Sequence, residues 1–448
     1  MCGIVGGVAE RCVTEILIEG LKRLEYRGYD SAGLALLNKE QILRERRVGK
    51  VANLAEAVSE QHLTGNIGIA HTRWATHGKP TENNAHPHQS NSGKIAIVHN
   101  GIIENYEELK SDLQKKGFDF HSETDTEIIA NLIQFNFDEI PDVKQAIIKT
   151  VGQLKGHYSF VVIFEDGTIA GARFHEPLIV GIGKDSYYLS SDVLGFIEKT
   201  DDAIYLDNED FVILNDTGIH IYGFDGSSVK YQITKVSKEF ADVYKGDYAH
   251  FTLKEISEQP DSISQAGNNE QIQQFVDGIK QAKNLYITGS GTSYNAAEVA
   301  KYLMSKFAKI KISTVIASEL PFSPDDIEHD STLVAISQSG ESADVLEAVK
   351  IAKESNTNIL SIVNHLNSSL SQESSLVMGL NCGPEIGVAA TKSFTSQLAI
   401  LYKIADKLCN GCINPNWEKV SSTVSQILSD NSKIKEISKD LKDITDIY

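Results

Sequence analysis

The chain has 448 residues, 41% hydrophobic and 23% charged, a globular composition that excludes a mostly disordered or collagen-like protein. Its net charge of −19 disfavours a broad nucleic-acid surface, although helix N-termini can still bind small anions. Five scattered cysteines do not indicate a disulfide framework, and no signal peptide or membrane-length apolar run occurs. We therefore expect a cytoplasmic protein of two or three domains, with no membrane or nucleic-acid partner.

The first part of the chain, residues 1–240, is rich in short apolar runs typical of β-strands. Turn signals such as Asp166-Gly167 separate several of them. Helical spacing of apolar residues occurs at 13–25 and 126–137. This mixture predicts a layered α+β domain. The predicted strands are 4–8, 33–37, 68–71, 94–99, 159–164, 178–182, 203–206 and 211–215.

Residues 241–283 are polar and are interpreted as a connector with an entry helix, with Pro260 near a helix boundary. Residues 284–448 then alternate strand and helix, which predicts an α/β domain with a doubly wound parallel sheet. A last helix at 433–441 precedes DITDIY, which reads as the first half of a strand. The predicted strands are 284–288, 311–317, 332–336, 358–363 and 376–380, with helices ending near 307, 354 and 408.

Cys2 is the residue of the sequence that most clearly indicates a catalytic nucleophile. If Met1 is removed, the thiol and the α-amine belong to the same residue, and an amine with a pKa of about 7.7–8.0 is a suitable general base. Such a residue is a nucleophile with its own base. An early cysteine that is merely a small buried hydrophobe is the alternative.

Five ordered blocks favour the nucleophile. The blocks MCGIVG, YRGYDSAG (26–33), HTRWATHG (71–78), HNGIIEN (99–105) and SETDTE (122–127) resemble the class II glutamine amidotransferase domain of the N-terminal nucleophile fold. The resemblance implies that Cys2 attacks the side-chain amide of glutamine and releases ammonia. It also implies an oxyanion hole formed by the Asn100 side chain and the Gly101 backbone N–H.

The same resemblance implies roles for the surrounding residues. Arg73 would bind the glutamine carboxylate and Asp125 its ammonium group. The other matching positions are Thr76 and His77 on the glutamine loop, Arg27 and Gly28 beside the nucleophile, and Trp74 as a gate of the ammonia channel. Taken singly, Arg73 and Asp125 would be read as solvated surface charges.

Two patterns invite a metal interpretation, which we do not favour. The histidines of the first domain include His86-Pro87-His88, but no cysteine or carboxylate pattern of ligand spacing accompanies them. A single Cys409-Asn-Gly-Cys412 at a helix end is likewise a weak redox or zinc signal. We expect no metal and no cofactor.

Two small-residue loops, GSGTS (289–293) and SQSGES (337–342), each follow a predicted strand and precede a helix. This geometry suits a phosphate. Neither loop is a P-loop, and Tyr294 stands where a dinucleotide fingerprint needs glycine. Together with EIGVAATKSFTSQ (385–397) the loops resemble the sugar isomerase (SIS) module. The resemblance implies sugar-phosphate binding by Ser293, Ser337, Gln338, Ser339, Ser342 and Val388.

An amidotransferase domain, a KEISEQP connector and an SIS domain together resemble the family of glutamine–fructose-6-phosphate aminotransferases. The family converts fructose 6-phosphate to glucosamine 6-phosphate with glutamine as nitrogen donor, the first step of hexosamine synthesis, and channels ammonia between its sites. Its members carry a second SIS module and a tail with acid–base groups, which the sequence does not show. We therefore expect complete glutaminase machinery, incomplete synthase machinery and a homodimer.

Three alternatives stay open. Phosphoribosyl amidotransferases and asparagine synthetases share the first domain, but their acidic diphosphate loop and SGG-type pyrophosphate loop do not occur here. The chain is alternatively a glutaminase alone. A non-catalytic sugar-phosphate sensor is the third possibility.

Overall fold

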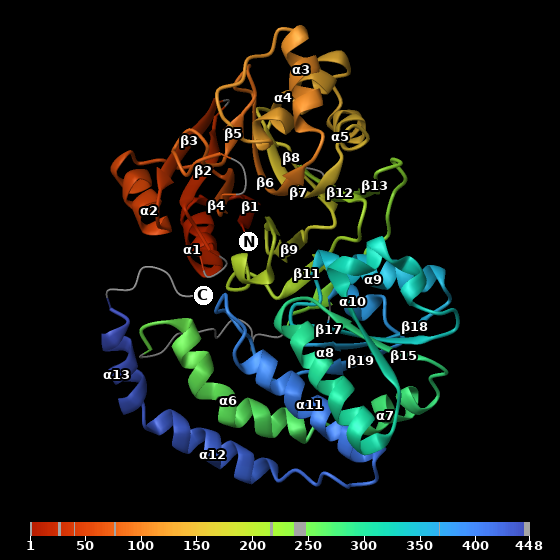
Figure 1. Ribbon diagram of the computed structural model, residues 1–448. Helices are drawn as coiled ribbons and strands as arrows, with labels where there is room; N and C mark the ends of the chain where they lie inside the picture. The colour runs from red at the N-terminus through yellow and green to blue at the C-terminus, as the bar shows by residue number, and fades with distance from the viewer. Residues whose placement is uncertain are drawn as a thin grey trace. The chain divides into compact units, whose positions relative to one another are not determined.

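The computed structural model describes residues 2–25, 28–39, 41–75, 78–215, 218–236, 248–366 and 368–442. The chain forms two compact units, Met1–Val243 and Tyr244–Tyr448 (Figure 1). Within the described residues, no helix is both long and apolar enough to cross a lipid bilayer.

Two antiparallel sheets form the centre of the first unit. One has eight strands in the order β14-β11-β9-β10-β1-β4-β2-β3, and the other has six in the order β13-β12-β8-β7-β6-β5. The strands of the first sheet are β1 (Gly3–Ala9), β2 (Ser31–Asn38), β3 (Gln41–Val48), β4 (Ile67–Arg73), β9 (Ile179–Gly183), β10 (Ser186–Ser190), β11 (Asp202–Tyr205) and β14 (Thr234–Lys235). Those of the second are β5 (His88–Gln89), β6 (Ile95–Ile103), β7 (Gly156–Phe164), β8 (Ile169–Phe174), β12 (Asp210–Asn215) and β13 (Gly218–Gly223).

Helices cover the outer faces of both sheets. The helices α1 (Thr14–Leu24) and α2 (Val51–Glu60) pack on the eight-stranded sheet. The helices α3 (Tyr106–Lys115), α4 (Thr126–Glu139) and α5 (Val143–Val151) belong to the core cluster on the six-stranded sheet (Figure 1).

Strand β6 shows why the layers form. Ile95 and Ile97 point into the helical layer, whereas Ala96 and Val98 pack between the sheets, since successive side chains of a strand alternate faces. A strand that is apolar on both faces must be covered on both, and the result is the layered α+β architecture expected from the sequence.

The second unit is built on a parallel sheet in the order β16-β15-β17-β18-β19. Its strands are β15 (Leu285–Gly289), β16 (Ile312–Ile316), β17 (Thr332–Ser337), β18 (Asn358–Val363) and β19 (Leu376–Gly379). Its helices are α6 (Phe251–Gly267), α7 (Ile272–Lys280), α8 (Thr292–Leu303), α9 (Ala343–Glu354), α10 (Ser369–Gln372), α11 (Lys392–Leu408), α12 (Trp417–Ser429) and α13 (Ser432–Asp440).

Separate apolar clusters lie on the two faces of this sheet. The helices α7, α8 and α11 contribute to one and α9 and α10 to the other, so the sheet is doubly wound. Both predicted fold classes are therefore confirmed. A disulfide joins Cys409 and Cys412 in the turn that follows α11, so the weak redox signal of this Cys-x-x-Cys pattern, which we did not favour, corresponds to a paired site.

Helix α6 differs from the expectation for Pro260, which lies inside the helix and not near its boundary. A proline removes the N–H that the carbonyl four residues earlier would accept. Here the side chain of Gln259 donates instead to the Ile256 carbonyl at 3.1 Å. This side chain offsets the lost backbone bond, and α6 continues to pack against α11 and α12. The DITDIY segment, residues 443–448, lies outside the described residues.

Candidate active site

Residues predicted from separate sequence blocks converge on one cavity of the first unit. Cys2 directly precedes β1, Arg73 ends the neighbouring strand β4, and Gly101 lies in β6 of the other sheet. Asp125 is the residue before α4. The cavity is lined by Cys2, Arg73, Trp74, His86, His99, Gly101, Thr124, Asp125 and Thr126.

The Cys2 thiol lies against the chain after β4. The backbone N–H of Trp74 donates to its Sγ at 3.2 Å. Burial raises the pKa of the Cys2 thiol above its ordinary value, and this exceeds the lowering by the Trp74 backbone. A thiol that resists ionisation needs a general base to become a nucleophile. The α-amine requires removal of Met1, which lies outside the described residues, so this part stays a prediction.

Asn100 and Gly101 are fixed beside the nucleophile. Asn100 Nδ2 donates to the Cys2 carbonyl at 3.3 Å, and Asn100 Oδ1 lies 3.0 Å from His71 Nε2. Gly101 has a φ of +107°, and a Cβ there would lie 2.0 Å from the His157 carbonyl oxygen. Only glycine fits this position, where β6 passes close to the backbone of β7 directly after Asn100.

Two opposite charges are buried at the cavity. Arg73 is 4% exposed, and its Nη2 donates to the Gly78 carbonyl at 3.2 Å while Nη1 lies 4.0 Å from Asp30. Asp125 is 5% exposed and accepts a hydrogen bond from the Ile103 N–H at 2.8 Å. Burial of charged side chains is costly, so a pair held at one cavity is well suited to an amino-acid ligand that carries both charges.

Trp74 and Gly28 are in contact. The Trp74 side chain is 54% exposed, and a Cβ on Gly28 would lie 2.5 Å from its ring. Three predicted residues, Arg27, Thr76 and His77, lie outside the described residues. The cavity measures only about 20 Å³, room for roughly one water molecule, so glutamine can bind only if side chains around it move.

The two small-residue loops of the second unit lie at adjacent strand ends. Strands β15 and β17 are parallel neighbours, with Gly289 opposite Ile336, so both loops emerge at the carboxyl edge of the sheet. A Cβ on Gly289 would lie 3.0 Å from the backbone of Ser293 and Tyr294, and glycine therefore permits the tight turn into α8. The loops lead directly into the N-terminal ends of α8 and α9, and helix N-termini are suited to binding an anion.

The hydroxyl groups of these loops are ordered by hydrogen bonds. Ser337 Oγ accepts from the Gly340 N–H at 3.0 Å and lies 3.2 Å from Ser342 Oγ. Ser339 Oγ accepts from the Glu341 N–H at 3.1 Å. Gln397 Nε2 donates to Ser293 Oγ at 3.0 Å. Gln338 lies in the same loop, with its carbonyl accepting from the Asn364 N–H at 3.1 Å.

Val388 lies in the segment between β19 and α11, and its side chain is 83% exposed. Asn364 links this segment to the SQSGES loop, since its side chain donates to the Gly383 carbonyl at 2.8 Å and its N–H to the Gln338 carbonyl at 3.1 Å. Glu255 of α6 holds this segment by accepting the Gly387 N–H at 2.8 Å and also the Ile386 N–H. The KEISEQP sequence therefore lies in a helix that supports the segment bearing Val388.

Comparison with known proteins agrees with both halves of this architecture. The family described as glutamine amidotransferase domain matches residues 71–197, and the SIS domain family matches residues 278–405. Glutamine–fructose-6-phosphate aminotransferase (isomerizing) of Acinetobacter baylyi is 46% identical over 444 residues, covering 95% of this chain and 72% of the relative. The enzyme of that name from Pyrococcus horikoshii is 40% identical over 461 residues, covering 100% and 77%.

The chain belongs to the glutamine–fructose-6-phosphate aminotransferase family. It spans about three quarters of the length of these two relatives. A solved C-terminal domain of glucosamine-fructose-6-phosphate aminotransferase from Francisella tularensis is 34% identical, with a TM-score of 0.39 over 45% of this chain and 62% of that structure.

Four buried histidines, His71, His86, His88 and His99, form a cluster at this cavity, and two of them, His86 and His99, line it. His86 stacks on His71 with ring centroids 4.2 Å apart and meets His88 edge-on at 5.1 Å. Threonine hydroxyls contact three of the rings: Thr126 lies 2.9 Å from His99 Nδ1 and 3.1 Å from His86 Nε2, and Thr124 lies 3.0 Å from His88 Nε2. Among the described residues, no group with the makings of a metal site is found.

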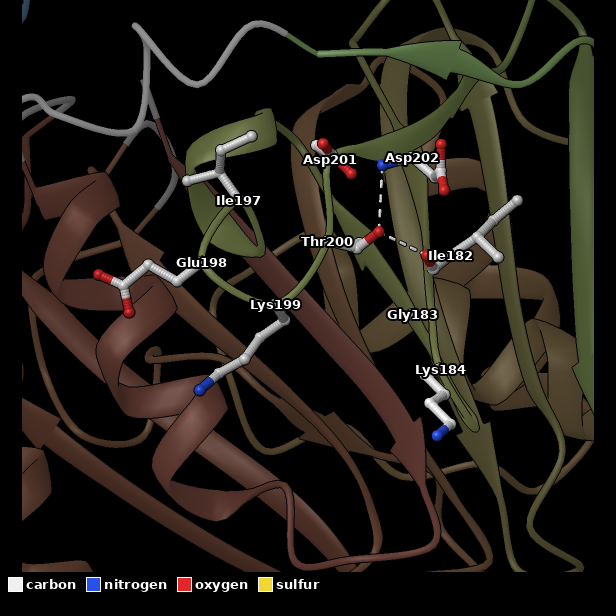
Figure 2. A pocket seen from close by; sticks show the side chains of 9 residues that line it. All are labelled: Ile182, Gly183, Lys184, Ile197, Glu198, Lys199, Thr200, Asp201 and Asp202. Carbon is white, nitrogen blue, oxygen red and sulfur yellow. Dashed lines mark hydrogen bonds between the residues drawn. The ribbon is translucent and has the colours of Figure 1, made fainter.

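A second cavity of the first unit shares no lining residue with the first. It measures about 330 Å³ and lies between the β9–β10 turn and residues 197–202 (Figure 2). Thr200 links its two sides, since its hydroxyl donates to the Ile182 carbonyl and accepts from the Asp202 N–H at 3.0 Å (Figure 2). The lining mixes Lys184, Glu198, Lys199, Asp201 and Asp202, and this mixture does not favour one ligand charge.

Three residues that support the predicted sites were not predicted from the sequence. His71 contacts Asn100 across 29 residues of sequence, and Gln397 contacts Ser293 across 104. Glu255 contacts the segment of Val388 across up to 132 residues. All three do fall inside the sequence blocks that carry the resemblance, His71 in HTRWATHG, Gln397 in EIGVAATKSFTSQ and Glu255 in KEISEQP, and this was the available signal.

Proposed function

We propose that this protein converts fructose 6-phosphate to glucosamine 6-phosphate with glutamine as the nitrogen donor. The glutaminase half of this proposal rests on the cavity of the first unit, where a thiol, an amide donor and two buried opposite charges lie together. Family membership and the paired phosphate-type loops of the second unit support the sugar-phosphate half.

The glutaminase step follows from these groups. Cys2 Sγ attacks the side-chain carbonyl carbon of glutamine, and its proton passes to a base, for which the freed α-amine is the candidate. The negative oxygen of the tetrahedral intermediate is stabilised by Asn100 Nδ2 and the Gly101 N–H. The base then returns the proton to the leaving nitrogen, so that collapse expels ammonia and leaves a thioester, which water hydrolyses to glutamate and free Cys2. Arg73 and Asp125 hold the carboxylate and the ammonium group of the substrate.

The roles proposed for the second unit concern binding. Ser293, Ser337, Ser339 and Ser342, with Gln338, would hold the phosphate of fructose 6-phosphate at the helix N-termini, and Val388 would line the sugar. The roles that the resemblance implies beside the nucleophile, around glutamine and on the ammonia path stay proposals for five further residues: Arg27, Gly28, Thr76, His77 and Trp74. We also propose a homodimer, which light scattering of the purified chain would test.

The proposal is tested with glutamine labelled with ¹⁵N at the side-chain amide, incubated with fructose 6-phosphate and the purified chain. Labelled glucosamine 6-phosphate and glutamate in equal amounts would support the full conversion and would overturn the expectation, drawn from the sequence, that the synthase machinery is incomplete. Glutamate with free labelled ammonia, and no labelled sugar, would limit this chain to a glutaminase. Binding of fructose 6-phosphate without any glutamate would favour the sensor.

A further inference from the structure

Asn100 is a side chain whose orientation decides its function. An amide turned by 180° exchanges a donor for an acceptor in nearly the same space. With Nδ2 toward Cys2, Asn100 stabilises a negative oxygen there, whereas with Oδ1 in that place it repels it. The structure must therefore fix one orientation, and only a few neighbours of Asn100 are able to do so.

Two partners bracket the Asn100 amide. The Cys2 carbonyl lies 3.3 Å from Nδ2, and a carbonyl only accepts, so the NH₂ group belongs on that side. On the other side, Oδ1 lies 3.0 Å from His71 Nε2. Oδ1 also only accepts, so this orientation of the amide assigns the His71 proton to Nε2. In the described part of the chain, Nδ1 has no partner within hydrogen-bond distance, although the His99 backbone also interacts with the ring.

His71 is well placed to hold that proton. It lies in β4 of the eight-stranded sheet while Asn100 lies in β6 of the six-stranded sheet, so the bond spans the two layers. Both side chains are buried, at 0% and 4% exposure. Desolvation lowers the pKa of His71 to about 3, so the ring is neutral near pH 7 and has a single proton. The stacked His86 ring fixes its plane.

We propose that His71 is the positioning residue of the oxyanion hole: its Nε2–H donates to Asn100 Oδ1 and holds Nδ2 toward the reacting carbonyl. This inference rests on the proposed glutaminase function. His71 acts through Asn100 and gives no proton to the substrate, so its loss affects the rate of reaction more than glutamine binding.

The test compares two amide replacements of the same residue. The NH₂ group of His71→Gln reaches the position of Nε2, whereas that of His71→Asn reaches only the position of Nδ1. Removing one oxyanion donor costs about 10²–10³ in kcat, and a freely turning Asn100 loses part of this. We expect His71→Asn to lower glutaminase kcat roughly tenfold to a hundredfold with little change in KM for glutamine. His71→Gln should stay within about threefold of wild type.

A double-mutant cycle separates positioning from general damage. In an Asn100→Ala background, His71→Asn should lower kcat no further, because nothing remains to be positioned. The matched control is His88→Asn, a buried histidine that bonds Thr124 and not Asn100, which should lose stability without the tenfold loss of kcat. Thermal melting of each variant shows whether it is folded.

Several results would overturn the inference. The first is an equal loss of kcat in His71→Gln and His71→Asn. The second is a loss of kcat by His71→Asn that stays as large in the Asn100→Ala background. The third is a rise in KM for glutamine with unchanged kcat. Failure of the proposed function is distinguishable, since the wild-type chain would then release no glutamate from glutamine, whereas failure of this inference leaves wild-type hydrolysis in place.

Discussion

At the scale of single residues, the proposed roles separate binding from chemistry. Arg73 and Asp125 are buried and hydrogen-bonded to backbone groups, whereas the Asn100 side chain donates to the Cys2 carbonyl. Changes to the first pair should therefore appear in KM and changes to the second in kcat.

The Arg73 prediction follows from the shape of its side chain. Arg73→Lys keeps the charge but loses the planar fork that bonds a carboxylate at two points. A charge-assisted hydrogen bond is worth about 1.5–3 kcal/mol, so we expect KM for glutamine to rise roughly tenfold to a hundredfold with kcat changed little. Steady-state glutaminase kinetics measure both. An unchanged KM would show that the carboxylate binds elsewhere.

Site prediction from the sequence succeeded where each residue lay in a recognisable block. Cys2, Arg73, Trp74, Gly101 and Asp125 were named in advance, and the fold places them around one cavity. Their roles remain proposals. His71 was missed as a partner of Asn100 because pairing across two sheets is a property of packing, which one sequence does not display.

At the scale of elements, long apolar patterns were predicted and short or mixed ones were not. Helix α4 and the strands β15 to β19 were all expected. Strand β3 was missed because QILRERRV is mostly polar and only Ile42 and Glu45 are buried. Helix α12 was also missed, although its apolar residues recur at helical spacing; it buries Trp417, and Val424 packs against the core cluster.

The prediction for the elements concerns Glu255 of helix α6, which supports the segment after β19. Glu255 is 2% exposed and accepts both the Ile386 and the Gly387 N–H. Glu255→Ala leaves these donors without an acceptor, at about 1–3 kcal/mol each. We expect it to destabilise the second unit by roughly 2–5 kcal/mol and to weaken fructose 6-phosphate binding.

Denaturant unfolding and calorimetric titration check these two effects. Glu347→Ala is the matched control, since the only contact that involves this carboxylate in the described residues is a loose ion pair at 3.9 Å, worth about 0–1 kcal/mol. Equal effects of the two substitutions would contradict the support assigned to α6.

At the scale of the whole molecule, each unit needs its own account of stability. Burial lowers the pKa of His71, His86 and His88 far below the ordinary value. The unfolded chain binds protons at these residues near pH 6.5, whereas the folded unit does not, so stability falls as pH drops below about 6.5. Asp210 opposes this, because burial raises its pKa to about 6 and the folded state binds its proton first.

Between pH 6.5 and 5.5, the three histidines lower the free energy of unfolding by more than Asp210 raises it. We expect the first unit to lose roughly 1 kcal/mol per pH unit for each histidine, less the contribution of Asp210. Hydrogen exchange followed by mass spectrometry reports this for peptides of β4 and β6, with peptides of β15 as the internal reference. Slower exchange in β4 and β6 at pH 5.5, after correction for the intrinsic rate, would contradict the sign.

The most direct measurement is glutamate release by the purified chain with Met1 removed, compared with Cys2→Ala. The account predicts that wild type releases glutamate and ammonia in equal amounts and that a Cys2 thioester is trapped by rapid acid quench and seen by mass spectrometry. It predicts neither for Cys2→Ala. Glutamate release at the same rate by Cys2→Ala, with no thioester in wild type, would show that Cys2 is not the nucleophile.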